Sequence, residues 1–243
     1  MITISPGHWK PGTGAVGLVD EVTEARKVVD RVVRMLTEKG ISVHHLKDDS
    51  SRSQAENLRY LVQAHNETER KVDVSVHFNA IAGKHTRAIG TEVLYKDAAV
   101  QPLAAQLSKA ISHAADLPDR GAKKRNELAF LNGTKQPAIL IEVCFVNSTI
   151  DVALYKQHFE AICETIAKQL AHHVRPIDNP FSSPALYERT QTLYQDKRYV
   201  RALLDKGVSQ GSISALWKER FESGELSFID FCGLCVLILE RRE

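Results

Sequence analysis

The sequence lacks an excess of one charge and any long apolar run. In its 243 residues, 32 Lys and Arg nearly balance 30 Asp and Glu, which gives a formal net charge of +2. The two signs are well mixed, so the chain has no basic stripe typical of a nucleic-acid-binding protein. The longest apolar stretch, residues 228–239, is interrupted by Asp230 and is too short to cross a bilayer. We therefore expect a buried helix there and no transmembrane segment.

Paired cysteines and an export signal are also missing. Cys232 and Cys235 have no second pair at zinc-ribbon spacing, so we expect all four cysteines to be reduced and mostly buried. Residues 1–5 open directly in a strand pattern, without the basic start, apolar stretch and cleavage site of a secretory signal. This pattern indicates synthesis in the cytoplasm. The densest basic run, residues 123–125, is expected in a solvated loop.

Apolar runs typical of strands alternate with amphipathic helical patterns over residues 1–172. Several of the runs are continuously apolar, which is typical of a sheet covered by helices on both faces, so the pattern predicts an α/β domain. Gly40 is expected to end the first helix, and Ser53 with Glu56 to open the second as a capping box. The expected strands are residues 2–5, 42–46, 73–77, 90–95 and 138–143, and the expected helices are residues 22–39, 53–65, 101–115 and 151–172.

Prolines mark a domain boundary after the last of these helices. Three prolines follow Arg175 within nine residues and cannot continue the helix, so we expect a catalytic domain at residues 1–175 and a linker at 176–184. Residues 185–243 are expected to form a small all-α unit that is marginally stable alone. Its helices are expected at residues 186–195, 199–206, 212–221 and 227–239. Its aromatic side chains are expected in the core rather than as sugar platforms: Tyr187, Tyr194, Tyr199 and Trp217.

Two histidines follow strand patterns. His8 comes after residues 2–5 and a Pro-Gly turn, and a glycine-containing loop follows it. His77 follows the alternating run at residues 72–76, at the strand end where open α/β sheets place their ligands. His8 alone would more often be structural, and the other histidines, such as His65, are expected on other elements or on helix surfaces and ends. Two histidines at strand ends with carboxylates from elsewhere nevertheless suit an open hydrolytic zinc site.

Two glutamates near the start of the first helix compete for a place beside these histidines. Side chains turn by about 100° per residue around a helix, so Glu21 lies roughly 60° from the centre of the apolar face and Glu24 roughly 120°. Glu21 therefore points further inward. A carboxylate that merely favours the helix dipole would explain either residue.

Glu142 lies within an apolar run at residues 138–146. An ionised carboxylate there carries a heavy desolvation cost unless it is paired, bound to metal or protonated. A buried salt bridge is one explanation. We favour the other, a general base whose proton affinity is raised by burial.

The segments around these residues resemble the zinc-dependent N-acetylmuramoyl-L-alanine amidases of bacterial cell walls and phage endolysins. The resemblance covers about residues 1–172 and depends on the order and separation of its motifs. One departure is the segment at residues 9–12, where many relatives run straight into two glycines. The motifs are Gly7-His8, residues 14–17 followed by Glu21, Ser75-Val-His-Phe-Asn-Ala80, Gly90-Thr-Glu-Val-Leu-Tyr95, Arg120-Gly-Ala-Lys123, and Ile141-Glu-Val143 with Asn147.

The resemblance implies a zinc ion bound by His8, Glu21 and His77, with Glu142 as the catalytic carboxylate. It also implies a twisted mixed sheet flanked by helices. The expected substrate is bacterial peptidoglycan, in which a zinc-bound water, with Glu142 as general base, would cleave the amide between N-acetylmuramic acid and L-alanine.

Several alternatives stay open. A zinc carboxypeptidase of similar layout would act on a different amide, and a non-enzymatic wall-binding module is disfavoured because all four site residues are present. The lack of an export signal favours a phage or prophage endolysin. The small helical unit would bind the wall, form a homodimer or pack on the first domain. Asp73, Asn79 or Asn147 would orient the metal ligands.

Overall fold

A computed structural model describes residues 1–174 and 184–240. The chain divides into two compact units, Met1–Pro176 and Ile177–Glu243. The predicted linker at residues 176–184 lies outside the described residues, apart from Pro184, which begins a helix. Within the described part of the chain, every helix is too short or too polar to cross a membrane.

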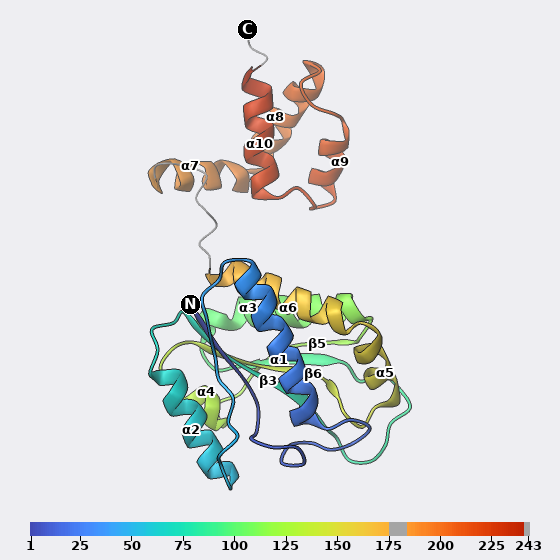
Figure 1. Cartoon of the computed structure of the whole chain (residues 1–243). Coiled ribbons are helices and arrows are strands. Elements are labelled where there is room, and N and C mark those ends of the chain that lie inside the picture. Colours follow the sequence, from blue (N-terminus) through green and yellow to red (C-terminus); the bar gives the residue numbers. More distant parts are fainter. Residues whose placement is uncertain (175–183, 241–243) are drawn as a thin grey trace. The chain divides into compact units, whose positions relative to one another are not determined.

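The first unit is built on one mixed sheet, which in the described residues has six strands in the order β2-β1-β3-β6-β4-β5 (Figure 1). The strands in the first half of that order are mutually parallel, and β6 continues this direction next to β3. β4 runs antiparallel to β6, and β5 runs parallel to β4. The bounds are β1 Ile2–Pro6, β2 Val43–His45, β3 Val72–Asn79, β4 Thr91–Tyr95, β5 Asp119–Lys124 and β6 Ala138–Phe145.

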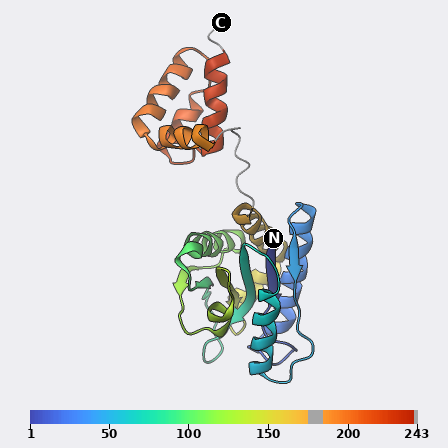
Figure 2. The same ribbon diagram turned by 90° about the vertical axis from the view of Figure 1, so that its left-hand side faces the viewer.

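Helices cover the two faces of the sheet unequally, as the two views show (Figures 1 and 2). α1, α3 and α6 enclose the main core on one face, where side chains such as Val28, Leu107 and Ile166 pack on the strands. The opposite face carries α2 and the short α4, with a smaller cluster that includes Phe130 and Leu140. The bounds are α1 Glu21–Glu38, α2 Gln54–Asn66, η1 Ala98–Val100, α3 Gln101–Ala115, α4 Ala129–Gly133, α5 Thr149–Gln157 and α6 Phe159–Val174. The predicted α/β sheet flanked by helices is confirmed.

The two expected helix caps form, one of them in an altered way. Gly40 has φ of 70°, and its N–H donates to the Thr37 carbonyl at 2.8 Å, so it ends α1 as expected. At the start of α2, the Ser53 hydroxyl accepts from the Glu56 N–H at 3.3 Å. The Glu56 carboxylate, however, accepts from the N–H of Arg52 instead of that of Ser53. The capping box is therefore half formed and shifted by one residue.

Three features of the first unit differ from the expectations. The basic run at residues 123–125 is not simply a solvated loop, because Lys123 and Lys124 belong to β5. The sequence of this strand is polar and therefore lacks the apolar pattern that predicts a strand. α4 was not expected. The helix predicted at residues 151–172 is broken at His158 into α5 and α6. Both halves have helical periodicity, so the sequence does not reveal the break.

His65 lies at the end of α2 as expected, but it is fully buried rather than on the surface. Its Nδ1 lies 2.7 Å from a carboxylate oxygen of Asp73, and its Nε2 lies 3.0 Å from the hydroxyl of Ser5. Arg70 donates to both carboxylate oxygens of Asp73. Burial lowers the pKa of His65 against the opposing effect of Asp73. Asp73 is thus engaged in a buried network that joins α2, β1 and β3.

The second unit is a small all-α bundle, as expected, around a core that contains Leu204, Phe231 and Leu234. Gly207 was expected to end the second of its helices, but the helix continues through it. A Cβ on Gly207 would approach the Ile238 side chain to 2.7 Å, so close packing explains the glycine. The bounds are α7 Pro184–Gln195, α8 Lys197–Ser209, α9 Leu216–Glu222 and α10 Phe228–Glu240.

The aromatic side chains of this unit meet the expectation in part. Tyr194 packs on the core and donates to the Leu226 carbonyl at 2.5 Å, and Trp217 is partly buried. Tyr199 is 41% exposed, so its assignment to the core was wrong. The side chain of Tyr187 lies outside the described residues.

α10 is only half buried, contrary to the expectation of a buried helix. Phe231, Leu234 and Ile238 point into the core, whereas Ile229 is 66% and Val236 52% exposed. A bundle of this size covers one side of the helix and leaves the other side apolar and open to solvent.

Removal of residues 176–243 is expected to leave the first unit folded, because every residue that the structure places in the main core lies at or before Val174. Thermal unfolding followed by circular dichroism should stay cooperative, with a midpoint within about 3 °C of the first transition of the whole chain. Loss of a cooperative transition would contradict this.

Candidate active site

The strand register brings three of the predicted site residues side by side. On one side of β3, Pro6 is the register partner of Val76, and the Gly7 N–H continues the ladder to the Val76 carbonyl at 2.8 Å. On the other side, His77 is paired with Glu142 of β6. The rings of His8 and His77 consequently meet edge to face, with centroids 5.2 Å apart. The two histidines and Glu142 therefore converge at one edge of the sheet.

The turn that presents His8 is tightly packed. His8 has φ of 62°, a left-handed conformation that is uncommon outside glycine and costs on the order of 1 kcal/mol or more. The preceding residue must be glycine, because a Cβ on Gly7 would lie 2.0 Å from Cε1 of His77. Such strain and close approach persist only where the surroundings hold them, which is typical of functional sites.

Glu21 joins the two histidines from the first turn of α1. It is 3% exposed, and both of its oxygens are engaged. Oε1 lies 2.9 Å from Nδ1 of His77 and accepts from the Phe78 N–H at 3.1 Å. Oε2 lies 3.3 Å from Nε2 of His8 and accepts from the Ala15 N–H at 2.6 Å. The site carboxylate therefore ties α1 to β3 and to the loop after β1.

Glu24, the competing residue, faces elsewhere. Its carboxylate accepts from the Tyr155 hydroxyl at 2.8 Å and pairs with Lys27. The helical angle argument therefore separated the two glutamates correctly in space.

The donor set of His8, Glu21 and His77 fits a zinc ion. One ligand atom from each residue can be chosen such that all three lie within 4.8 Å of one another. Ligands at about 2.0–2.2 Å from a tetrahedral zinc lie roughly 3.3–3.6 Å apart, close to the 2.9 and 3.3 Å contacts that the two imidazoles make with Glu21. Two imidazoles with one carboxylate is also a donor set of catalytic zinc sites, which keep a fourth position open.

The hydrogen bonds around Glu21 keep it ionised. Burial alone would raise its pKa, but the hydrogen bonds and charges of His77 and His8 outweigh burial and hold the pKa well below its usual value of 4.5. The carboxylate therefore offers a permanent negative charge to a cation.

Glu142 is in the opposite electrostatic situation. Its Oε2 is buried and has no hydrogen-bond partner among the described residues. Burial, followed by the negative charges of Glu21 and Glu92, raises the pKa of Glu142 to about 8. In the part of the chain that the structure describes, no cation pairs with Glu142, in contrast to the salt bridge that was one explanation for it. A carboxyl group whose pKa lies near neutral pH suits proton transfer.

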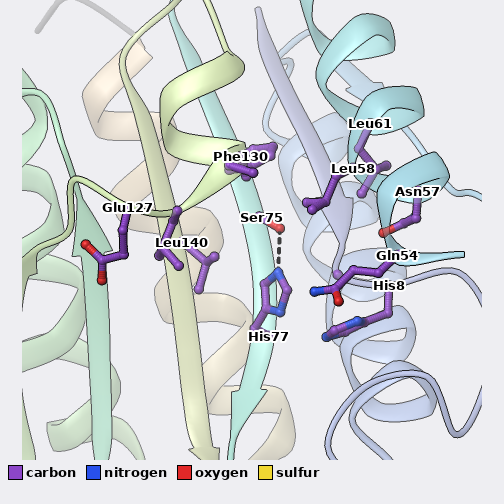
Figure 3. A pocket seen from close by; sticks show the side chains of 13 residues that line it. His8, Gln54, Asn57, Leu58, Leu61, Ser75, His77, Glu127, Phe130 and Leu140 are labelled. Carbon is purple, nitrogen blue, oxygen red and sulfur yellow. Dashed lines mark hydrogen bonds between the residues drawn. The ribbon is translucent and has the colours of Figure 1, made fainter.

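None of the three residues expected to orient the ligands contacts them. Asp73 belongs to the buried network with His65, Asn79 donates to Glu92 at 3.2 Å, and Asn147 donates to the carbonyls of two residues in the loop after β3. The contact comes instead from Ser75, whose hydroxyl lies 3.0 Å from Nε2 of His77 (Figure 3). The signal was available in the sequence, because residues two apart on a strand share a face.

A cavity of about 330 Å³ opens beside His8 and His77, between α2 and α4. Figure 3 shows Gln54 and Leu58 from α2 on one side and Phe130 from α4 on the other. This volume is at the lower end for small-molecule sites. The sparsely covered face of the sheet thus provides a pocket that reaches the candidate metal ligands.

Two imidazoles and a buried carboxylate that converge beside an unpaired carboxyl group, at strand ends of an α/β sheet, are typical of a metal-dependent hydrolase. Residues 2–172 match the protein family described as N-acetylmuramoyl-L-alanine amidase. The chain belongs to this family.

Curated relatives include uncharacterised proteins and one named amidase. The chain is 29% identical over 181 residues to an uncharacterised 38.4 kDa protein of Clostridium perfringens. The alignment covers 70% of this chain and 53% of that protein. It is 27% identical over 168 residues to the germination-specific N-acetylmuramoyl-L-alanine amidase of Bacillus subtilis (strain 168), which covers 63% of this chain and 70% of that protein. The chain spans about half the length of the two Clostridium perfringens relatives that it matches.

Solved structures show the same fold. The catalytic domain of the CD27L endolysin targeting Clostridia difficile aligns with a TM-score of 0.62 and 24% identity, over 70% of this chain and 95% of that one. The catalytic domain of CwlV, an N-acetylmuramoyl-L-alanine amidase from Bacillus (Paenibacillus) polymyxa var. colistinus, aligns with a TM-score of 0.62 and 24% identity, over 71% and 97%.

In the metal-free protein, the Glu142→Gln variant is expected to be more stable than the wild type. The difference in the free energy of unfolding should grow as the pH rises. The folded pKa of about 8 lies above the usual 4.5, so between these values the folded wild type binds more protons than the unfolded chain and loses stability as the pH increases. The advantage of the variant should be small near pH 4 and should reach a few kcal/mol, in order of magnitude, above about pH 8. Urea unfolding across this range measures it. An advantage that does not change with pH would contradict the prediction, and the exposed Glu127→Gln is the control.

Gly7→Ala is expected to weaken zinc binding without unfolding the unit. The added methyl group would overlap the ring of His77 and displace it from Glu21. A loss of about 10-fold or more in zinc affinity, measured by competition with a chelating dye, is the expected result. Unchanged affinity would show that the His77 ring is not held in this position when metal binds.

Proposed function

We propose that the protein is a peptidoglycan hydrolase that cleaves the amide bond between N-acetylmuramic acid and L-alanine. The observation that carries the proposal is the convergence of His8, Glu21 and His77 beside Glu142 in a chain of this family. In this proposal the first three residues hold zinc. When bound, zinc lowers the pKa of a coordinated water and polarises the carbonyl under attack.

The protein residues provide the proton transfers. Glu142 accepts a proton from the attacking water and delivers it to the nitrogen of L-alanine as the C–N bond breaks, so that the products are a muramoyl carboxylate and a free amine. The raised proton affinity of this buried carboxyl group supports both steps near neutral pH.

Ser75 and Glu21 hold His77 in position for this reaction. Without metal, Nδ1–H of His77 donates to the Glu21 carboxylate 2.9 Å away. With zinc on Nδ1, the ring proton would be on Nε2, which would donate to the hydroxyl of Ser75 at 3.0 Å. This hydrogen bond fixes the ring orientation and its tautomer, as partners of metal-binding histidines generally do.

The alternative of a zinc carboxypeptidase differs in its products. A carboxypeptidase would release free amino acids from peptides that carry no sugar, whereas the proposed amidase requires the muramoyl group and exposes the amino group of L-alanine. Incubation with purified bacterial walls, followed by identification of the new end groups, separates the two activities.

Glu142→Gln is expected to separate chemistry from metal binding. The amide keeps the shape of the carboxyl group but does not accept the proton of water, so turnover should fall by on the order of 10² to 10⁴. Zinc, measured by elemental analysis, should remain stoichiometric. Near-normal turnover would assign Glu142 a structural role, and loss of zinc from a folded variant would make it a metal ligand.

His77→Ala provides the complementary result. With two protein ligands left, zinc and activity should be lost together. His113→Ala, on the exposed face of α3, is the matched control and should keep both. A His77→Ala variant with full zinc would remove His77 from the proposed site.

A phage or prophage endolysin is the setting that we propose for this activity. Such an enzyme reaches the wall only after another protein opens the membrane. Expression in a bacterium whose wall the purified protein degrades should therefore cause lysis only when a membrane-permeabilising agent is added. Lysis without such an agent would favour an exported autolysin.

The second unit is proposed to bind the wall or to form a homodimer. The exposed apolar side of α10, with Ile229 and Val236, is a surface available for either role. Removal of residues 176–243 distinguishes the two: weaker binding to whole walls supports targeting, and a change from dimer to monomer in light scattering supports assembly.

A further inference from the structure

A second buried carboxylate lies one strand away from Glu142. Glu92 of β4 is the register partner of Glu142 of β6, so both side chains point to the same face of the sheet. Glu92 is 3% exposed. One of its oxygens accepts from Arg120 Nε at 2.7 Å and lies 2.6 Å from Lys123 Nζ, and the other accepts from Asn79 at 3.2 Å. Side chains from three strands, β3, β4 and β5, thus meet at this group.

This cluster has more positive charge than Glu92 neutralises. Arg120 and Lys123 both pair with the same carboxylate oxygen, which leaves a net charge of about one positive unit. Among the described residues, no other carboxylate pairs with either cation. The terminal nitrogens of Arg120 have no hydrogen-bond partner there, and each side chain is 34% exposed. The cluster therefore has free donors that face solvent.

The guanidinium group of Arg120 is held in place from two sides. Its Nε is bonded to Glu92, and its carbon atom lies 5.1 Å from the centre of the Phe145 ring, in a cation–π contact. A guanidinium fixed in this way presents its two terminal nitrogens as a preformed fork, which matches the two oxygens of a carboxylate.

The position of the cluster relates it to the proposed cleavage site. His77, Glu142 and Glu92 lie in one row across β3, β6 and β4. Neighbouring strands are about 4.8 Å apart, so Glu92 begins about 5 Å beyond Glu142, and the cations that pair with it lie on the far side, towards β5. An extended peptide advances about 3.3–3.6 Å per residue. A carboxylate on the second residue after the scissile amide would therefore reach the cluster.

We propose that Arg120 and Lys123 bind a carboxylate of the peptide part of the substrate, on the second residue after the scissile bond, and that Glu92 orients them. This inference rests on the proposed function. It assigns the β4–β5 side of the site to the peptide, because the N-acetylated sugars carry no ionised group whereas the peptide does. It also places the departing L-alanine beside Glu142.

The test uses two soluble muramoyl dipeptides that differ only in whether the second residue carries a carboxylate or a carboxamide. Because the two substrates differ in this group alone, any preference between them reports on the carboxylate. The wild-type zinc enzyme should cleave the carboxylate form with a KM about 10-fold lower and a similar kcat, since one charge-assisted contact corresponds to roughly a tenfold change. Equal KM values for the two substrates would overturn the proposal.

Arg120→Gln and Lys123→Gln should each remove most of this preference by raising KM for the carboxylate form alone. Lys124→Gln is the matched control, because it removes the same charge from the neighbouring, exposed position of β5 and should keep the preference. If the two variants lost activity equally on both substrates, the cluster would serve only to hold β4 and β5 together. Thermal unfolding checks that each variant is folded.

A binding measurement separates this inference from the proposed function. Calorimetry would compare the binding of the two dipeptides, without the muramoyl group, to the wild-type zinc protein. A preference for the carboxylate form that Arg120→Gln removes, in a protein that cleaves no muramoyl amide, would overturn only the function. Cleavage without any charge preference in binding or KM would overturn only the role of Arg120 and Lys123.

Discussion

The burial of one negative charge organises the site. Glu21 is almost inaccessible to water, and an uncompensated carboxylate in that position would cost several kcal/mol. Compensation comes from two backbone N–H groups, of Ala15 and Phe78, and from the imidazoles of His8 and His77. These partners belong to the loop after β1 and to β3, so the charge of Glu21 fixes three segments that are distant in sequence. A divalent cation would find its ligands already gathered.

The unequal covering of the sheet explains why the site is accessible. On one face, α1, α3 and α6 cover the central strands, and that face provides the main core. On the other face, α2 and α4 leave a cavity between them that Ser75 and His77 of β3 line. The same strands thus alternate between stabilising the fold on one face and presenting reactive groups on the other. Ser75, His77, Glu92 and Glu142 all belong to the second set.

Sequence patterns predicted those parts of the fold and site that depend on local periodicity. The apolar runs located five of the six strands in the described chain, and the helical angle placed Glu21 rather than Glu24 beside the histidines. β5 was not predicted, because its residues are polar. It forms a strand because it pairs with β4 and its cations contact Glu92.

Partners at long range could not be predicted in the same way. The residues proposed to orient the ligands were wrong, because a side chain such as Asp73 could reach either the site or His65, and only the packing of α2 decides between them. Burial of His65 likewise depends on contacts that no local pattern encodes. The sequence therefore did not predict which polar side chains form hydrogen bonds with one another across the sheet.

The place of Glu142 in the sheet has a consequence for the dynamics of the protein. β6 lies between β3 and β4, so it is hydrogen bonded on both sides, and its inner face packs in the main core. Backbone amides of such a strand exchange with deuterated water only when most of the domain opens. The proposed acid–base group is thus attached to a slowly exchanging part of the unit. Local opening elsewhere in the domain would therefore leave Glu142 in its place beside His77.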